Sequence, residues 1–226
     1  MINIYIIDIN TLPDPKDITD KLNIFPYTRK DKMLRLSSAP KRKQALASSI
    51  LMHKILTDNN LDFNDIYYGT NNKPLCHKIN FNISHRKDIV ICAASQYNIG
   101  CDIEMTDSFI TKDRIYKMSK RFFHTEEAAF LEDISSDQSS LVYNFYRIWT
   151  IKESYVKMTG TGLTTPLNSY HVNLSNDNAE ILIDNSLVNC SIMETNLKNY
   201  HISVCHEGPK DDILCTFVSH FLSGNN

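Results

Sequence analysis

Two carboxylates stand two residues apart at the end of an apolar run, at Asp102 and Glu104 in NIGCDIE. On a β-strand the period of two places both side chains on one face, while Cys101 and Ile103 point the other way. Two carboxylates ~4 Å apart at an effective dielectric of ~20 repel by roughly 4 kcal/mol, which favours a bound cation or a shared proton. Two solvated acids at a strand end would leave the same pattern.

A second chemical stretch is FYRIWTIKESYVKMTGTGL, residues 145–163. On a helix Trp149, Glu153 and Lys157 are spaced by four and share a face, so an acid and a base lie beside an aromatic ring. A solvated ion pair on a helix surface is the simpler interpretation of this spacing. If Glu153 meets the two acids of the strand, the three carboxylates make an oxygen-rich site suited to Mg²⁺.

Basic residues and a histidine precede these acids in the sequence. Ser84 and His85 interrupt an apolar run in INFNISHRKDIVICAAS, where a strand terminus and a hydrogen-bonded structural histidine are the simpler interpretations. The early basic residues, which would also fit a solvated helix face, are Arg29, Lys30, Lys32, Arg35, Lys41, Arg42 and Lys43. Basic groups combined with a carboxylate cluster suggest a polyphosphate held between cations and a metal.

Composition limits the class of protein. The 226 residues, 42% apolar and 22% charged, suffice for one well-buried domain or two small packed ones, and exclude a fibrous or disordered chain. A net charge of -2 implies no bulk attraction to nucleic acid or to a membrane surface. The opening MINIYIIDIN lacks a basic leader and a spanning length, and six cysteines without C-x-x-C spacing indicate buried, reduced thiols. We therefore expect a cytoplasmic protein with neither nucleic acid nor membrane as partner.

Periodicity predicts the elements that position these residues. In chain order we expect a first strand at 1–10, a core helix from Lys41, strands at 79–84, 88–95 and 98–104 in an antiparallel meander, helices at 111–133 and 140–159, and short strands in the tail. No linker rich in Gly, Pro or Ser divides the chain. The expected fold class is α+β.

Several fragments in order resemble one family. NISH followed by IGCDIE, and WTIKESYVKMTGTGL, resemble the two signatures of the Sfp-type 4'-phosphopantetheinyl transferases, and NKPL and RFFHTEE fit in type and order. The resemblance covers about residues 72–166. It implies two similar α+β halves related by a pseudo-two-fold axis, with coenzyme A in the cleft between them. We place the halves at 1–105 and 106–226, together one catalytic unit, and expect a monomer.

The resemblance also implies an activity. The family transfers the 4'-phosphopantetheine arm of coenzyme A to a serine of an apo acyl or peptidyl carrier protein and releases adenosine 3',5'-bisphosphate. Residue by residue it implies Asp102, Glu104 and Glu153 as Mg²⁺ ligands, Ser84 and His85 at the phosphates, Lys157 at the pyrophosphate, Lys73 and Pro74 by the adenine, and Arg29 and Lys32 near the 3'-phosphate. Glu153, or a water that it positions, is the expected base, and His85 and Lys157 would hold the other phosphate oxygens.

Two departures and two alternatives accompany this resemblance. Asn72 stands where the family usually has glycine, and an arginine expected early in the first core helix falls near Gln44, beside Arg42 and Lys43. One alternative is a non-catalytic coenzyme A-binding protein that has kept the cleft, and the presence of all three acids argues against it. The other is a metal-dependent hydrolase of nucleotide pyrophosphates, which the sequence separates from a transferase only through the family resemblance. Chain length and the two-half pattern favour the broad-substrate type, which serves peptide synthetases, polyketide synthases or siderophore assembly.

Overall fold

Two units make up the chain in the computed structural model, which describes residues 2–69, 73–106, 109–174, 178–209 and 213–218. One unit is Met1–Gln96 with Asp212–Asn226, and the other is Tyr97–Asp211. The division falls at 96/97, not at 105/106 as the sequence suggested, because β6 (Ile99–Met105) pairs within the second unit and β12 (Ile213–Phe217) within the first. The predicted α+β class is confirmed, and the pseudo-two-fold relation of the halves stays a prediction.

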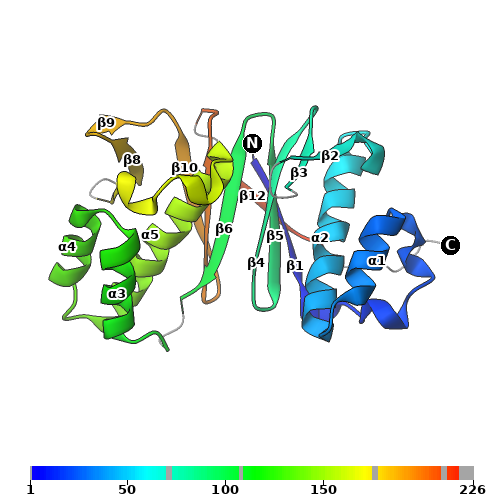
Figure 1. Cartoon of the computed structure of the whole chain (residues 1–226), viewed down its shortest axis with the longest axis horizontal. Coiled ribbons are helices and arrows are strands. Elements are labelled where there is room, and N and C mark those ends of the chain that lie inside the picture. The colour runs from blue at the N-terminus through cyan, green and yellow to red at the C-terminus, as the bar shows by residue number, and fades with distance from the viewer. Residues whose placement is uncertain (1, 70–72, 107–108, 175–177, 210–212, 219–226) are drawn as a thin grey trace. The chain divides into compact units, whose positions relative to one another are not determined.

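The first unit contains a four-stranded sheet of order β12-β1-β5-β4, in which β1 pairs with β12 in parallel and the other pairs are antiparallel (Figure 1). A second, small sheet is β2-β3. The other elements of this unit are β1 (Ile2–Asp8), α1 (Tyr27–Arg35), α2 (Ala39–Asp58), β2 (Ile66–Tyr68), β3 (Pro74–Cys76), β4 (Asn80–Arg86), β5 (Ile89–Ser95) and 3-10 turns at Ile9–Thr11, Pro15–Asp17, Lys21–Ile24 and Phe63–Asp65.

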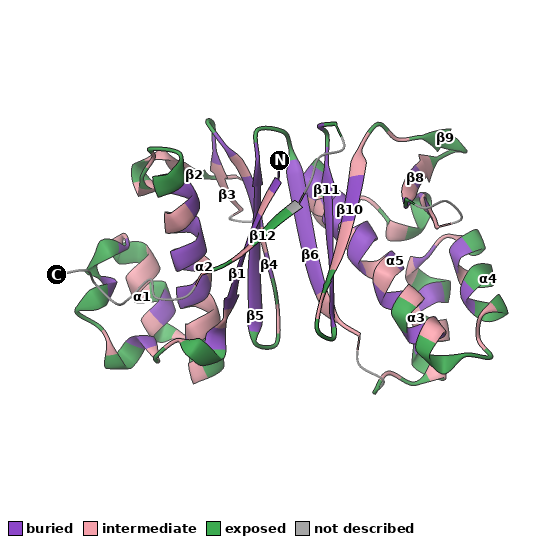
Figure 2. Ribbon diagram, turned by 180° about the vertical axis from the view of Figure 1, so that it is seen from behind, coloured by how far each residue is buried: buried purple, intermediate pink, exposed green. Residues whose placement is uncertain are grey.

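Helix α2 forms the core of the first unit against one face of this sheet. Its apolar stripe, with Leu46 and Ile50 fully buried, packs in one cluster with Val90 and Cys92 of β5. Every residue of β5 is buried, as its unbroken apolar sequence predicts for a central strand (Figure 2). The ends of β4 and β5 are therefore positioned by a well-packed core.

The second unit combines helices with two antiparallel sheets, of order β10-β11-β6 and β7-β8-β9. Its elements besides β6 are α3 (Lys112–Phe122), α4 (Thr125–Asp133), α5 (Gln138–Thr159), β7 (His171–Asn173), β8 (Glu180–Ile183), β9 (Ser186–Leu187), β10 (Ser191–Leu197), β11 (Tyr200–His206) and 3-10 turns at Gly162–Thr164 and Leu167–Ser169.

Helix α5 is the centre of this unit. Asp137 caps its start by accepting a hydrogen bond from the Ser139 N–H at 2.9 Å, and Gly160 ends it in the left-handed region at φ 71°. Its residues belong to two apolar clusters, one with β7, β8, β10 and β11 and the other with α3 and α4. This packing fixes the helix that carries Trp149, Glu153 and Lys157.

Three sequence expectations need correction. The helix expected at 111–133 is two helices, because Phe123 and His124 are extended and His124 and Glu127 form a capping box at the start of α4. The expected meander ends after β4 and β5, since β6 pairs with β11. All six cysteines are free thiols as expected, but Cys190 is partly buried and Cys215 is exposed.

In the described part of the chain, no helix has both the length and the apolar character needed to cross a bilayer. Asn72, a point of departure from the family pattern, lies outside the described residues.

Candidate functional site

One face of β6 carries the acidic residues and lies against α5. Gly100, Asp102 and Glu104 alternate along the strand and share this face, whereas Cys101 and Ile103 are fully buried on the other. A Cβ on Gly100 would lie 2.0 Å from the Ser154 carbonyl oxygen and about as close to the next turn of the helix. The helix backbone therefore approaches β6 at a distance that only glycine allows.

The close approach brings an ammonium group onto an acid. Lys157 Nζ donates to Asp102 Oδ1 at 2.6 Å and to the Cys101 carbonyl oxygen at 3.2 Å. Burial lowers the pKa of Lys157, but Asp102 above all, with Cys101 and Glu153, outweighs burial and raises it overall. The ammonium is therefore a permanent cation at the acidic end of β6.

Glu153 belongs to the same electrostatic group. Burial raises the pKa of its carboxyl, the neighbouring Asp102 raises it further, and Lys157 lowers it in part. Trp149, Glu153 and Lys157 are all partly exposed between buried neighbours, which confirms that they share one face of α5. The structure thus brings Asp102, Glu153 and Lys157 together from two elements distant in sequence.

The acidic residues of β6 and α5 offer the kind of donor that the expected divalent cation takes. Carboxylate oxygens are the hard donors that Mg²⁺ prefers, and the effect of Asp102 on the pKa of Glu153 shows two acids near enough to repel, a repulsion that a cation would relieve. The donor atoms of Asp102, Glu104 and Glu153 do not all lie within 4.8 Å of one another. Among the described residues, this spacing is met by one atom each of His124, Glu126 and His171. The three carboxylates are therefore the right type of ligand for Mg²⁺, and their assignment as its ligands stays a prediction.

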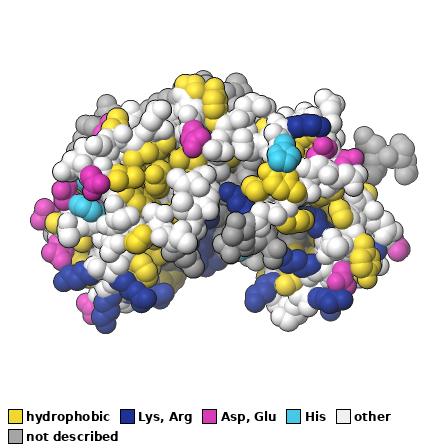
Figure 3. All heavy atoms as spheres, turned by 45° about the horizontal axis from the view of Figure 1, so that its top comes forward, with side chains coloured by type: hydrophobic (Ala, Val, Ile, Leu, Met, Phe, Trp, Pro, Cys, Tyr) yellow, Lys and Arg dark blue, Asp and Glu magenta, His cyan; other side chains and the backbone are white. Residues whose placement is uncertain are grey.

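Some of the basic residues of the first unit line a cavity of about 580 Å³. Arg29 and Lys32 of α1, Pro74 of β3 and His85 of β4 line it together with apolar and hydroxyl side chains. On the first unit, at the right of Figure 3, basic and hydrophobic side chains lie close together on the face shown. Cationic and apolar walls in one cavity suit a ligand that has both an anionic group and a flat ring.

Two other predicted residues do not line this cavity. Ser84 is buried and directly follows Ile83, which lines the cavity with His85, so the alternation of β4 points Ser84 to the opposite face. Lys73 is partly buried before β3 and is not among the lining residues. Of the pair Ser84 and His85, only His85 therefore faces the cavity.

Arg29 is held by local contacts that leave donor capacity unused. Its Nη1 donates to Ser49 Oγ at 3.1 Å, and its guanidinium lies over the Phe63 ring, 5.6 Å from the centroid. Its Nε is buried and has no hydrogen-bond partner among the described residues. A buried guanidinium donor at a cavity wall is suited to bind an anion.

Arg42, in contrast, has a structural role. Its guanidinium makes a bidentate pair with Asp14, at 2.8 Å from Nε and 2.6 Å from Nη2, and Nη1 donates to the carbonyls of Leu36 and Ser37. Gln44 donates to the Lys87 carbonyl at 2.8 Å. Neither residue lines the cavity, so the arginine that the family pattern places early in this helix has no counterpart there.

The sequence analysis assigned no role to one buried ion pair. Lys152 Nζ lies 2.8 Å from Glu127 Oε1 with both side chains fully buried, and it donates to the carbonyls of Leu167 and Tyr170 at 2.8 Å. Burial lowers the pKa of Lys152 and Glu127 raises it in part. Glu127 also accepts from the N–H groups of His124 and Val172, at 2.7 and 2.6 Å. The ion pair joins α4, α5 and β7. In the sequence, the stretch HTEE was the only local pattern that pointed to it.

Comparisons with known proteins identify the family of this chain. Residues 98–205 match the model of the 4'-phosphopantetheinyl transferase superfamily. The 4'-phosphopantetheinyl transferase gsp of Aneurinibacillus migulanus is 33% identical over 170 residues, 72% of this chain and 68% of that protein. The 4'-phosphopantetheinyl transferase Sfp of Bacillus subtilis is 30% identical over 200 residues, 85% of this chain and 86% of that protein.

The chain belongs to the 4'-phosphopantetheinyl transferase family. The match to the superfamily model lies inside the second unit of this family member and contains Asp102, Glu104, Glu153 and Lys157. The cavity of the first unit lies outside that match. A crystal structure of holo-ACP-synthase from Plasmodium yoelii has a TM-score of 0.36 and 16% identity, covering 49% of this chain and 92% of that one, and is too distant to define the fold.

Proposed function

We propose that this family member transfers the 4'-phosphopantetheine arm of coenzyme A to a serine of an apo acyl or peptidyl carrier protein and releases adenosine 3',5'-bisphosphate. Supporting it are the family membership and, above all, the group of Asp102, Glu153 and Lys157 on β6 and α5. In the reaction the serine Oγ forms a bond to the β-phosphorus, the bond to the leaving phosphate breaks, and the serine proton passes to a base.

The charged residues of the second unit would act on the reacting pyrophosphate. We assign Glu153 as base because it is the one acid in the sequence of α5 and shares a face with Lys157. Lys157 would hold a phosphate oxygen and stabilise the negative charge of the leaving group, and Asp102 keeps it protonated. Mg²⁺ held by Asp102, Glu104 and Glu153 would neutralise charge on the pyrophosphate.

The cavity of the first unit would bind the nucleotide end of coenzyme A. Arg29 and Lys32 would contact the 3'-phosphate, Pro74 with Lys73 would lie by the adenine, and His85 would donate to a phosphate oxygen. The buried Arg29 Nε supports this assignment, because a phosphate would supply its acceptor. Ser84 lies on the other face of β4, so among the residues predicted to contact coenzyme A it has the least structural support.

Transfer is tested by intact mass spectrometry of an apo carrier domain incubated with the protein, coenzyme A and Mg²⁺. We expect the mass of one phosphopantetheine to be added, addition to stop with EDTA, and Glu153→Gln to slow transfer at least about 100-fold. Glu132→Gln, an exposed acid on α4, is the matched control and should keep full rate. Excess Mg²⁺ would restore a variant that had lost only a ligand, and would not restore one that had lost the base.

Other results would identify another function. Coenzyme A that binds without modifying carriers of peptide, polyketide or fatty acid type would indicate a binding protein. Phosphopantetheine released with no carrier present would indicate a hydrolase. Either result contradicts the proposal.

The nucleotide end has its own test. Arg29→Gln should raise the dissociation constant for coenzyme A about 10- to 100-fold, the effect of losing one charge-assisted hydrogen bond, and leave that for 3'-dephospho-coenzyme A unchanged. Equal weakening for both ligands would show that Arg29 does not contact the 3'-phosphate.

The proposal also covers the carrier protein, the oligomeric state and the cellular compartment. Carriers of peptide synthetases, polyketide synthases or siderophore assembly are the proposed partners, and the protein acts as a monomer. Its six free thiols suit a reducing cytoplasm.

A further inference from the structure

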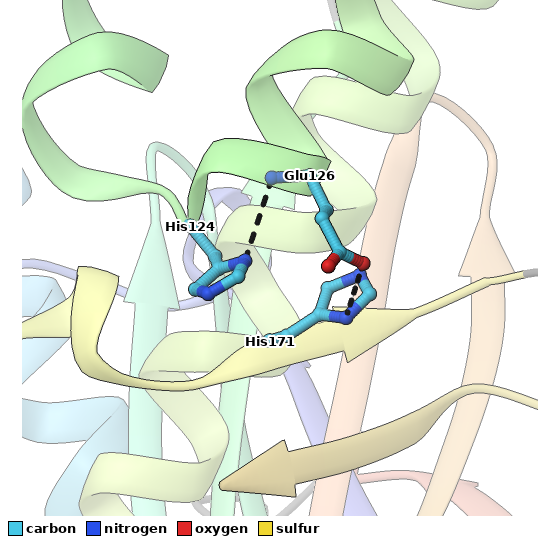
Figure 4. A group of neighbouring side chains, drawn as sticks. All are labelled: His124, Glu126 and His171. Carbon is cyan, nitrogen blue, oxygen red and sulfur yellow. Dashed lines mark hydrogen bonds and ion pairs between the residues drawn. The ribbon is translucent and has the colours of Figure 1, made fainter. Parts of the chain in front are cut away.

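Two histidines and a glutamate, none of them assigned to transfer, converge on the second unit (Figure 4). His124 precedes α4, Glu126 lies in its first turn, and His171 lies on β7. One ligating atom from each lies within 4.8 Å of the other two. We propose that His124, Glu126 and His171 form a binding site for a divalent transition metal, best fitted by Zn²⁺.

The chemistry of the donors selects the ion. Two imidazole nitrogens and one carboxylate oxygen are a ligand set that Zn²⁺ uses when three protein groups bind it and a fourth position stays open. Mg²⁺, which prefers oxygen donors and keeps its waters, is a poor fit to two imidazoles. The site therefore differs in ion from the carboxylates of β6 and α5.

The contacts already made show that the three side chains face one another. The rings of His124 and His171 are stacked, with centroids 5.3 Å apart and planes at 20°. His171 Nδ1 lies 3.3 Å from Glu126 Oε2. Tetrahedral Zn²⁺ with bonds of ~2.0–2.1 Å needs donor atoms roughly 3.3 Å apart, so modest side-chain rotations suffice. Glu126 has 63% of its side chain exposed and is free to make that rotation.

One buried carboxylate fixes the two histidine backbones. Glu127 accepts from the N–H of His124 at 2.7 Å and from the N–H of Val172, next to His171, at 2.6 Å. Lys152 holds Glu127 in place at 2.8 Å, with both side chains fully buried. The backbone positions from which the two imidazoles extend are therefore set before a metal arrives, which reduces the entropy lost on binding.

Two local features oppose the metal, and both are weak. His124 Nδ1 accepts from the Glu126 N–H at 3.4 Å, a long hydrogen bond that is lost when the ring binds a metal through either nitrogen. The start of α4 carries a partial positive charge, which the Glu126 carboxylate offsets. A bound metal would join α4 to β7.

The test is a Zn²⁺ titration of the full chain in competition with a chromophoric chelator. We expect one equivalent to bind, and His124→Asn, Glu126→Gln and His171→Thr each to weaken binding at least about tenfold. Asparagine at 124 keeps a good helix cap and threonine at 171 suits a strand, so these variants should fold. The matched controls are His77→Asn and Glu132→Gln, exposed residues outside the cluster, and should bind as the original chain does.

Cobalt distinguishes this site from the free thiols. Co²⁺ bound to imidazole and carboxylate gives visible bands without the near-ultraviolet thiolate band that cysteine ligands produce. Zn²⁺ should also raise the midpoint of thermal unfolding of the original chain and the controls but not of the three site variants. A thiolate band, binding no tighter than about 100 µM, or equal binding by site variants and controls would overturn the proposal.

Discussion

Replacing Gly100 with alanine should displace α5 from β6. The added Cβ would lie 2.0 Å from the Ser154 carbonyl oxygen and 2.3 Å from the Met158 nitrogen, whereas ordinary contacts begin at 3.4 Å. The helix backbone must therefore retreat by about 1.4 Å, the difference between these two values. Overpacking costs ~1–3 kcal/mol and sometimes more, and because both obstacles are helix backbone we expect a loss of about 3 kcal/mol or more.

The same displacement should reduce transfer. Helix α5 carries Glu153 and Lys157, and a misplacement of ~1 Å at a reacting centre can reduce rate by about 100-fold. The folded fraction of Gly100→Ala, measured below its unfolding transition, should therefore modify an apo carrier about 100-fold more slowly than the original chain. Stability is measured as the free energy of unfolding by equilibrium denaturation in urea.

Gly208→Ala is the matched control. Its Cβ would approach the Tyr97 ring at 2.3–2.8 Å, but this obstacle is the side chain of a residue that is 47% exposed and not helix backbone, so the expected loss is under about 1 kcal/mol. A loss below about 1 kcal/mol for Gly100→Ala, or equal losses for both variants, would refute a close approach of α5 to β6.

Three further predictions use other contacts. Glu127→Gln should lower the free energy of unfolding by ~3–5 kcal/mol because it leaves a buried lysine charge uncompensated, while Glu132→Gln on the same helix should change it by under about 1 kcal/mol; similar values in urea denaturation would contradict the buried pair. Burial raises the pKa of Glu194, but hydrogen bonds from Arg147 and the nearby imidazole of His201, with Nε2 at 3.1 Å, lower it from 4.5 to about 2. Its contribution is therefore present above pH 4.5 and lost as pH falls towards 2, up to about 3 kcal/mol, and Glu194→Gln should flatten that part of the stability-pH curve; an unchanged slope would refute this. Arg42→Lys should lower the thermal midpoint but leave the dissociation constant for coenzyme A unchanged, in contrast to Arg29→Gln; weaker coenzyme A binding would show that Arg42 contacts the ligand.

Local patterns identified much of the acidic site. Alternation along β6 placed Asp102 and Glu104 on one face, and the spacing of four placed Glu153 with Lys157 on one face of α5. Both patterns depend on backbone periodicity alone, which a short window of sequence contains. The same windows could not show that Lys157 reaches Asp102, because that contact joins residues 55 apart.

Sequence by itself determined the fold class, the family and the residue types available for chemistry, since these follow from composition, period and order along the chain. Only the tertiary structure assigned partners. It paired β6 with β11, placed Arg42 on Asp14, turned Ser84 away from His85, and brought His171 to His124. Each of these outcomes depends on which distant segment occupies the space beside a given face, and local propensity carries no information about that choice.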